Sequence, residues 1–191
     1  MQAMKTLLTS LLVAAFVAAG AYAAEGVGAE RRLPVVAIPD YCQSNGVVSV
    51  KRSMTEAILK AGCLPVLLPE MEDPAVDQFL SQCDAVMVGG GIKGQDYPRR
   101  CAYEGRVIAL AAKRGLPIVG ICHGCQVINL HFGGTIAPGV RVTARAEDGV
   151  IEAIEHETLP IFGFQFHPEI YWKKDARCLE LIRLALRGKR K

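Results

Sequence analysis

Two residues that can do chemistry each follow a short apolar run. Cys122 is the centre of Gly120-Ile121-Cys122-His123-Gly124, directly after Leu116-Pro117-Ile118-Val119 and just before a helical pattern. A strand, a Gly-x-Cys-x-Gly turn and a helix form a nucleophile elbow, because the glycines allow the sharp turn that exposes one side chain. The first amides of the following helix favour a thiolate over a thiol. The pattern predicts Cys122 as a nucleophile.

A thiolate needs a base, and His167 has the most suitable context among the four histidines. It ends the apolar run 161–166 and is followed by Pro168-Glu169. A strand end brings the imidazole to the same sheet edge as the elbow, and a carboxylate two residues on can hold the ring in one tautomer. We therefore predict His167 as base and Glu169 as its orienting group. His131 and His156 are predicted to be structural.

These residues resemble the fingerprint of class I glutamine amidotransferases, Gly-x-Cys-x-Gly-x-Gln with a late His-Pro-Glu. Here the two halves are Gly120 to Gln126 and His167-Pro168-Glu169. Within that superfamily the chain is most similar to the gamma-glutamyl-gamma-aminobutyrate hydrolase branch, the peptidase C26 type. The further matching stretches are 61–69, 89–91 and 148–155, and the resemblance covers nearly everything after residue 33.

The resemblance implies cleavage of a small gamma-glutamyl amide through a Cys-His-Glu triad and a gamma-glutamyl thioester, with Gln126 near the glutamyl end. The oxyanion formed on the way needs donors already aimed at it. The elbow supplies the backbone amide of His123, which we expect to act through its backbone rather than its side chain. A second donor is predicted at Gly90 or Gly91, because the strand at 85–88 ends on the same edge and glycine allows close backbone approach.

The segment between Gly134 and Val140 departs from the family. Related hydrolases carry a substantial insertion there with a His-His-Gln-type motif, whereas this chain has only Ile136-Ala137-Pro138-Gly139 after Thr135. The glycine loop also differs, since Ile92 stands where relatives more often have an acidic residue. Two alternatives to the hydrolase therefore stay open: a degenerate, non-catalytic binding module on the same fold, and the glutaminase subunit of an amidotransferase.

The composition of the chain is typical of a globular protein. The chain has 191 residues, 51% hydrophobic, with a net charge of +3, which indicates one globular domain with an adequate core. Basic residues are mixed with acidic ones except in the run 187–191, a solvated tail by this interpretation, so no nucleic-acid partner is expected. No cofactor is needed for the chemistry, and no metal site is predicted from the Cys and His spacing. A homo-oligomer is compatible with the sequence.

The first residues have the pattern of a signal peptide. Lys5 precedes an apolar stretch from Leu7 to Gly20, and Ala21-Tyr22-Ala23 suits signal peptidase. The apolar stretch is shorter than the ~20 residues that span a bilayer, so no stable membrane anchor is expected. We divide the chain into a signal peptide (1–23), a disordered lead-in (24–32), the amidotransferase-like domain (33–187) and a basic tail (188–191). The protein is expected to be exported, to the periplasm or the exterior.

Seven cysteines in an exported protein leave at least one unpaired, and Cys122 is the natural one. Cys125, one helical turn on, is predicted to be a small core residue. A Cys122 to Cys125 disulfide that switches the enzyme off is the alternative for this pair.

Apolar runs alternate with helical patterns, which predicts an α/β fold. The expected architecture is flavodoxin-like and doubly wound, a mostly parallel sheet with helices on both faces and a β-hairpin before the last core strand. The hairpin turn is Asp148-Gly149. Expected strands are 33–38, 65–68, 85–88, 116–119, 140–146, 150–155 and 161–166, and expected helices 47–60, 73–82, 99–114, 127–132 and 173–186.

Overall fold

The computed structural model describes residues 32–40, 47–91, 97–134 and 138–188. The predicted signal peptide, nearly all of the predicted lead-in, residues 189–191 of the tail and Cys42 lie outside these ranges. So do residues 92–96 of the glycine loop and 135–137 of the shortened connection.

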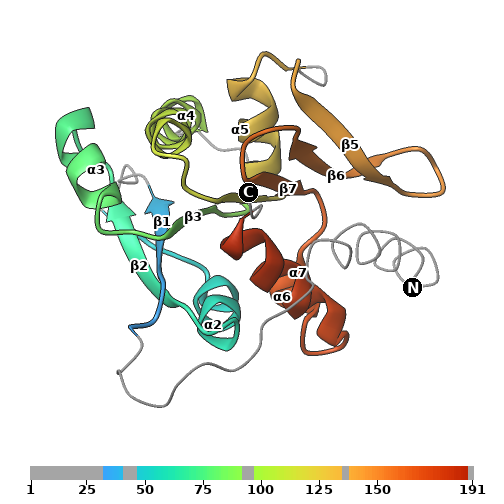
Figure 1. Ribbon diagram of the computed structural model, residues 1–191. Helices are drawn as coiled ribbons and strands as arrows, with labels where there is room; N and C mark the ends of the chain where they lie inside the picture. The colour runs from blue at the N-terminus through green and yellow to red at the C-terminus, as the bar shows by residue number, and fades with distance from the viewer. Residues whose placement is uncertain (1–31, 41–46, 92–96, 135–137, 189–191) are drawn as a thin grey trace.

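The described residues form one seven-stranded sheet, with strand order β2-β1-β3-β4-β7-β6-β5 (Figure 1). Five neighbouring strands are parallel, and β5 and β6 are an antiparallel hairpin that precedes β7 in the chain. The strands are β1 (Val35–Asp40), β2 (Leu64–Pro69), β3 (Ala85–Val88), β4 (Ile118–Ile121), β5 (Val140–Arg145), β6 (Ile151–His156) and β7 (Ile161–Phe164). This confirms the predicted fold class, including the hairpin before the last core strand.

Helices cover both faces of the sheet, with α2, α6 and α7 on one face and α3, α4 and α5 on the other (Figure 1). They are α2 (Arg52–Lys60), α3 (Asp73–Leu80), α4 (Tyr97–Lys113), α5 (His123–His131), α6 (Pro168–Tyr171) and α7 (Ala176–Arg187). Alternate residues of one strand enter different cores, because side chains of a strand point to opposite faces. In β3, Met87 packs with the α2 and α7 residues while Val86 and Val88 pack with those of α4 and α5.

Two helices begin later than predicted. The pattern from Val47 predicted a helix to Lys60, but 47–51 is not helical and α2 begins at Arg52. The backbone N–H of Ser49 donates to the Asp40 carboxylate at 2.6 Å, which ties this segment to the end of β1, and the β-branched valines there do not favour helix. The last helix begins at Ala176, not 173, because Asp175 caps it by accepting from Arg177 N at 3.0 Å.

Parallel pairing places the ends of β4 and β7 side by side. Ile121, the last residue of β4, pairs with Phe164, the last residue of β7. The carboxyl ends of parallel strands meet at one edge, so whatever follows these two strands is brought together there.

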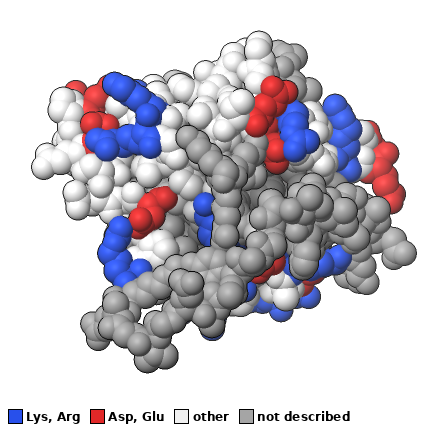
Figure 2. Space-filling view, in the orientation of Figure 1, with Lys and Arg blue, Asp and Glu red and all other residues white. Residues whose placement is uncertain are grey.

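Charged side chains of both signs lie next to one another on the surface. Figure 2 shows basic and acidic residues side by side on one face of the molecule. Some are ion pairs between elements, such as Arg106 with Asp73 and Arg141 with Glu155. Exposed pairs of this kind contribute about 0 to 1 kcal/mol each, so we place the main source of stability in the two apolar cores.

Candidate active site

Cys122 lies at the junction of β4 and α5 in an unusual backbone conformation. Its φ is 52° and its ψ is −102°, and no other non-glycine residue of the described ranges has a positive φ. Such a conformation costs about 1 to 3 kcal/mol and persists only where the surroundings hold it. Here the Cys122 N–H donates to the Phe164 carbonyl of β7 at 2.7 Å, and the Cys122 carbonyl accepts from Gln126 N at 3.2 Å. The turn thus fixes the side chain at the carboxyl edge of the sheet.

The two glycines around the cysteine are required by packing. A Cβ placed on Gly120 would lie 2.6 Å from the Gly124 carbonyl carbon, and one on Gly124 would lie 2.8 Å from the Val88 carbonyl carbon. Real Cβ atoms do not approach backbone this closely. The first turn of α5 therefore packs directly on β3 and β4. The absence of side chains at Gly120 and Gly124 allows this close contact.

His167 follows β7 and immediately precedes α6. Its Nδ1 lies 2.8 Å from Oε1 of Glu169, whose side chain is fully buried, while the His167 side chain is 28% exposed. A buried carboxylate needs a hydrogen-bonding partner, and the imidazole supplies it. The contact occupies Nδ1, so Nε2 is the nitrogen left to act on a substrate.

Gly90 lies close to both the cysteine and the histidine. A Cβ on Gly90 would lie 2.8 Å from Cε1 of His167 and 3.4 Å from the Cβ of Cys122. The bare backbone of Gly90 therefore borders both side chains. Gly91 has a different neighbour, since a Cβ there would overlap the guanidinium of Arg100. The structure thus separates the two glycines that the sequence left equivalent.

Gln126 lies beside the site and contacts a residue that the sequence analysis did not single out. Its Nε2 donates to Oε1 of Gln165 at 3.2 Å, and Gln165 Nε2 donates to the Cys122 sulfur at 3.7 Å. The available signal was a glutamine within the otherwise apolar run 161–166, two residues before His167. Gln165 therefore contacts the cysteine directly, and Gln126 reaches it only through Gln165.

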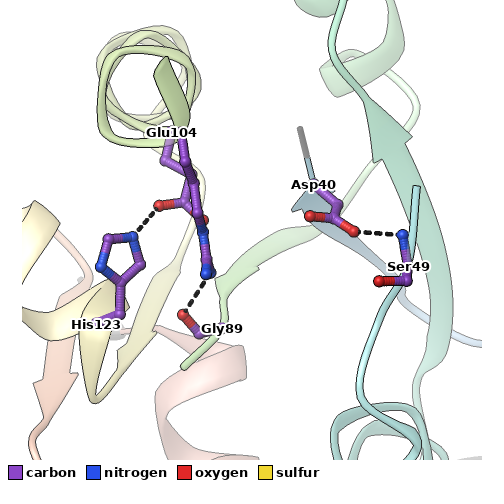
Figure 3. Close-up of polar contacts among 6 residues, drawn as sticks. Asp40, Ser49, Gly89, Glu104 and His123 are labelled. Carbon is purple, nitrogen blue, oxygen red and sulfur yellow. Dashed lines mark hydrogen bonds and ion pairs between the residues drawn. The ribbon is translucent and has the colours of Figure 1, made fainter. Parts of the chain in front are cut away.

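A buried polar network lies behind the elbow, and the sequence analysis did not predict it. Glu104 of α4 is 0% exposed and His123 is 2% exposed. His123 Nε2 lies 2.6 Å from Glu104 Oε2, and Arg100 Nε donates to Glu104 Oε1 at 2.9 Å. Arg100 Nη2 also donates to the Gly89 carbonyl at 3.2 Å. Figure 3 shows Glu104 extending from α4 to the His123 ring, with Gly89 nearby. The structure thus adds a buried side-chain contact to the backbone role predicted for His123.

The other two histidines lie apart from this network. His131 is the last residue of α5, and its ring packs edge-on against Phe132. His156 ends β6, and its Nδ1 accepts from the backbone N–H groups of Thr158 and Leu159. The His156 ring nitrogen thus satisfies two backbone N–H groups of the turn after β6, which is a structural role.

Six cysteines lie in the described ranges, and all six are free. Cys125 is buried in α5, and a Cβ on Gly163 would lie 2.8 Å from its sulfur. Burial, followed by the nearby Cys122 and Glu152, raises the pKa of the Cys125 thiol to about 12. Cys125 thus has the properties of a core residue.

Iodoacetamide at pH 8 is expected to label Cys122 and to leave Cys125 unmodified in the folded protein. The reagent needs an accessible thiolate, and Cys125 is buried with a pKa far above this pH. Peptide mass spectrometry after short exposure checks this, with Cys122→Ala and Cys125→Ala as paired controls. Rapid labelling of Cys125 in folded Cys122→Ala would contradict the burial argument.

Two negative findings apply to the described part of the chain. Within it, no group of three His, Cys, Asp or Glu residues could hold a metal ion. None of the helices in the same ranges has the length and apolar character needed to cross a bilayer.

Comparisons with known proteins identify the family and the fold of the chain. The model of the Peptidase C26 family matches residues 34–138 and 135–169, more than half of the chain. The two matched stretches overlap at residues 135–138. Since both halves of the fingerprint lie inside the match, the family covers Gly90, Cys122 and His167 together.

The individual relatives are named as glutamine amidotransferase-like proteins or GMP synthase subunits. A glutamine amidotransferase-like protein of Rickettsia prowazekii is 31% identical over 46% of this chain, a stretch that spans only 36% of that protein. The glutamine-hydrolysing GMP synthase subunit of Methanospirillum hungatei is 27% identical over 72% of this chain and 87% of its own length. Among solved structures, a candidate GMP synthase subunit of Thermoplasma acidophilum superposes with a TM-score of 0.61 at 17% identity, covering 82% of this chain and 95% of that one. From the family match we conclude that the chain belongs to the Peptidase C26 family, in the class I glutamine amidotransferase-like superfamily.

Proposed function

We propose that this protein is a cysteine hydrolase that cleaves a gamma-glutamyl amide bond. The observation that carries the proposal is the meeting of Cys122 and His167 at the bare backbone of Gly90, with Glu169 on the other side of the imidazole. A nucleophile, a base and an orienting carboxylate in this order form the arrangement used for acyl transfer.

The chemistry follows from these roles. His167 takes the proton of the Cys122 thiol, and the sulfur attacks the gamma carbonyl carbon of the substrate to form a tetrahedral intermediate. As that intermediate collapses, the carbon–nitrogen bond breaks and the protonated His167 donates its proton to the leaving amine. Water, deprotonated by His167, then attacks the thioester, which releases glutamate and regenerates the thiol.

Two backbone amides are assigned to the oxyanion. One is the N–H of His123, the residue after the nucleophile, which begins α5. The other is the N–H of Gly90, since Gly90 borders Cys122 while Gly91 is packed against Arg100. Gln126 and Gln165 are assigned to the glutamyl part of the substrate, because the Gln165 amide contacts the sulfur and the Gln126 amide contacts Gln165.

The leaving group distinguishes this proposal from a second one. The relative from Methanospirillum is named as a glutamine-hydrolysing subunit of GMP synthase, which favours a glutaminase that passes ammonia to a partner. We prefer simple hydrolysis, because the N-terminal pattern is typical of an exported protein and a biosynthetic partner would normally be cytosolic. Export is part of this proposal.

A small amide panel tests the proposal. Purified protein and Cys122→Ala are assayed with glutamine, gamma-glutamyl-aminobutyrate and gamma-glutamyl p-nitroanilide, in reducing and non-reducing buffer. Turnover of at least one amide, abolished by Cys122→Ala, is the expected result, and the preferred amide begins to name the leaving group. Glutamine as the sole substrate would favour the glutaminase alternative. Inactivity of the folded protein on every amide would favour the non-catalytic binding module.

A further inference from the structure

Glu104 lies on α4, a helix that supplies none of the groups given roles above. Its carboxylate is fully buried, and burying a charge is costly unless each oxygen has a partner. One oxygen accepts from Arg100 and the other lies 2.6 Å from the His123 ring. Nδ1 of His123 is buried without a hydrogen-bond partner among the described residues. A proton on Nδ1 would be unsatisfied, so the ring proton belongs on Nε2, where it is donated to Glu104.

Through Arg100, Glu104 reaches the glycine loop. Arg100 is held at Nε by Glu104 and uses Nη2 to bind the Gly89 carbonyl. In a trans peptide the carbonyl and the next N–H point in opposite directions, and the described residues contain no cis peptide. The bond to Arg100 therefore turns the Gly90 N–H away from Arg100. His167 and Cys122 are the residues that a Cβ on Gly90 would meet.

Through His123, Glu104 reaches the elbow. The peptide between Cys122 and His123 carries the second proposed oxyanion donor, and it follows the strained φ of Cys122. The ring of His123 is held at Nε2 by Glu104 and packs edge-on against Tyr97, with 5.1 Å between centroids. A fixed ring restricts rotation of the backbone to which it is attached.

We propose that Glu104 is a positioning residue that holds both oxyanion donors, the Gly90 amide through Arg100 and the His123 amide through the His123 ring. The proposal rests on the proposed function, since it concerns the charge that develops during acylation. Figure 3 shows the Glu104 side chain directed from α4 toward the His123 ring, with the Gly89 carbonyl on the same side of the helix. Donors aimed in advance stabilise the transition state more than the bound substrate, so the effect of Glu104 belongs in kcat rather than KM.

Glu104→Gln is the informative variant. A carboxylate accepts from both partners, whereas an amide has one acceptor oxygen and turns an NH₂ group toward the other partner. At least one arm is then lost with little change in shape. We expect kcat for the preferred gamma-glutamyl amide to fall about 100-fold, as for loss of an oxyanion donor, with KM within about twofold of wild type.

Alkylation of Cys122 by iodoacetamide separates positioning from general damage. In that reaction a sulfur–carbon bond forms and iodide leaves, and no oxyanion develops. Glu104→Gln should therefore keep its alkylation rate within about twofold of wild type while acylation by gamma-glutamyl p-nitroanilide falls about 100-fold. A merely structural role would lower both rates together.

The matched control is Tyr103→Phe, one residue earlier on α4. Tyr103 is fully buried, and its hydroxyl lies within hydrogen-bond distance of the Leu68 and Pro69 carbonyls, away from the elbow. Tyr103→Phe should lower the urea midpoint yet leave acylation unchanged. Should Glu104→Gln not fold, Arg100→Lys cuts the Gly89 arm alone and is expected to slow acylation about 10-fold with normal alkylation.

The experiment distinguishes failure of the positioning role from failure of the hydrolase proposal. Equal acylation in Glu104→Gln and wild type, or a parallel loss of acylation and alkylation, overturns the positioning role and leaves the hydrolase proposal intact. A folded wild-type protein that acylates with none of the amides overturns both, because there is then no oxyanion to stabilise.

Discussion

His167→Gln is expected to lower kcat/KM for the preferred gamma-glutamyl amide by about a thousandfold, within the range for loss of a general acid–base. Glutamine can still donate to Glu169, so the buried carboxylate keeps a partner, but an amide cannot accept and return a proton at neutral pH. The loss should therefore come from chemistry and not from unfolding. Steady-state kinetics with an unchanged urea midpoint is the measurement.

The control for this variant is His131→Gln, the same substitution at the end of α5. The ring of His131 contacts Phe132, and the residue lies outside the site, so activity should stay at the wild-type level. The activity of Glu169→Gln is expected to lie between those of His167→Gln and His131→Gln, about a hundredfold below wild type. The reason is that the amide no longer selects the productive tautomer of His167. Full activity in His167→Gln would remove His167 from the mechanism.

The second large effect concerns the elbow itself. Gly124→Ala is expected to lower the free energy of unfolding by about 3 kcal/mol, the upper part of the usual range for overpacking. The added methyl would meet the backbone carbonyl of Val88, the last residue of β3. To relieve this overlap, either β3 or the first turn of α5 must shift, and α5 packs on both β3 and β4. Urea unfolding followed by circular dichroism measures the change.

Gly105→Ala is the matched control, the same substitution within a helix. A Cβ on Gly105 of α4 meets nothing within 4 Å, and Gly105 does not have a positive φ. Alanine there should raise the free energy of unfolding by about 0.5 to 1 kcal/mol, because glycine loses more backbone freedom on folding. The two glycine substitutions are thus expected to have opposite signs. A Gly124→Ala protein as stable as wild type would mean that α5 does not rest on β3 as described.

Much of the fold was readable in the sequence because each signal is local. Apolar runs of strand length alternate with helical patterns, and Asp148-Gly149 marks the hairpin, so the parallel sheet and its antiparallel extension were both predicted. The element ends were less well predicted. The segment before α2 is tied to the end of β1 by a hydrogen bond from the Ser49 N–H to the Asp40 carboxylate, and no local sequence pattern contains that contact.

The candidate site divides in the same way. The sequence by itself determined the Gly-x-Cys-x-Gly turn and the His-x-Glu spacing, since both are built within a few residues. Only the tertiary structure decided that Gly90, not Gly91, borders Cys122. It also decided that Glu104 is buried. Arg100 and Glu104 are four residues apart on a helix, a spacing equally common for solvated ion pairs, and the packing of α4 against α5 and the glycine loop is what removes the pair from water and joins it to His123.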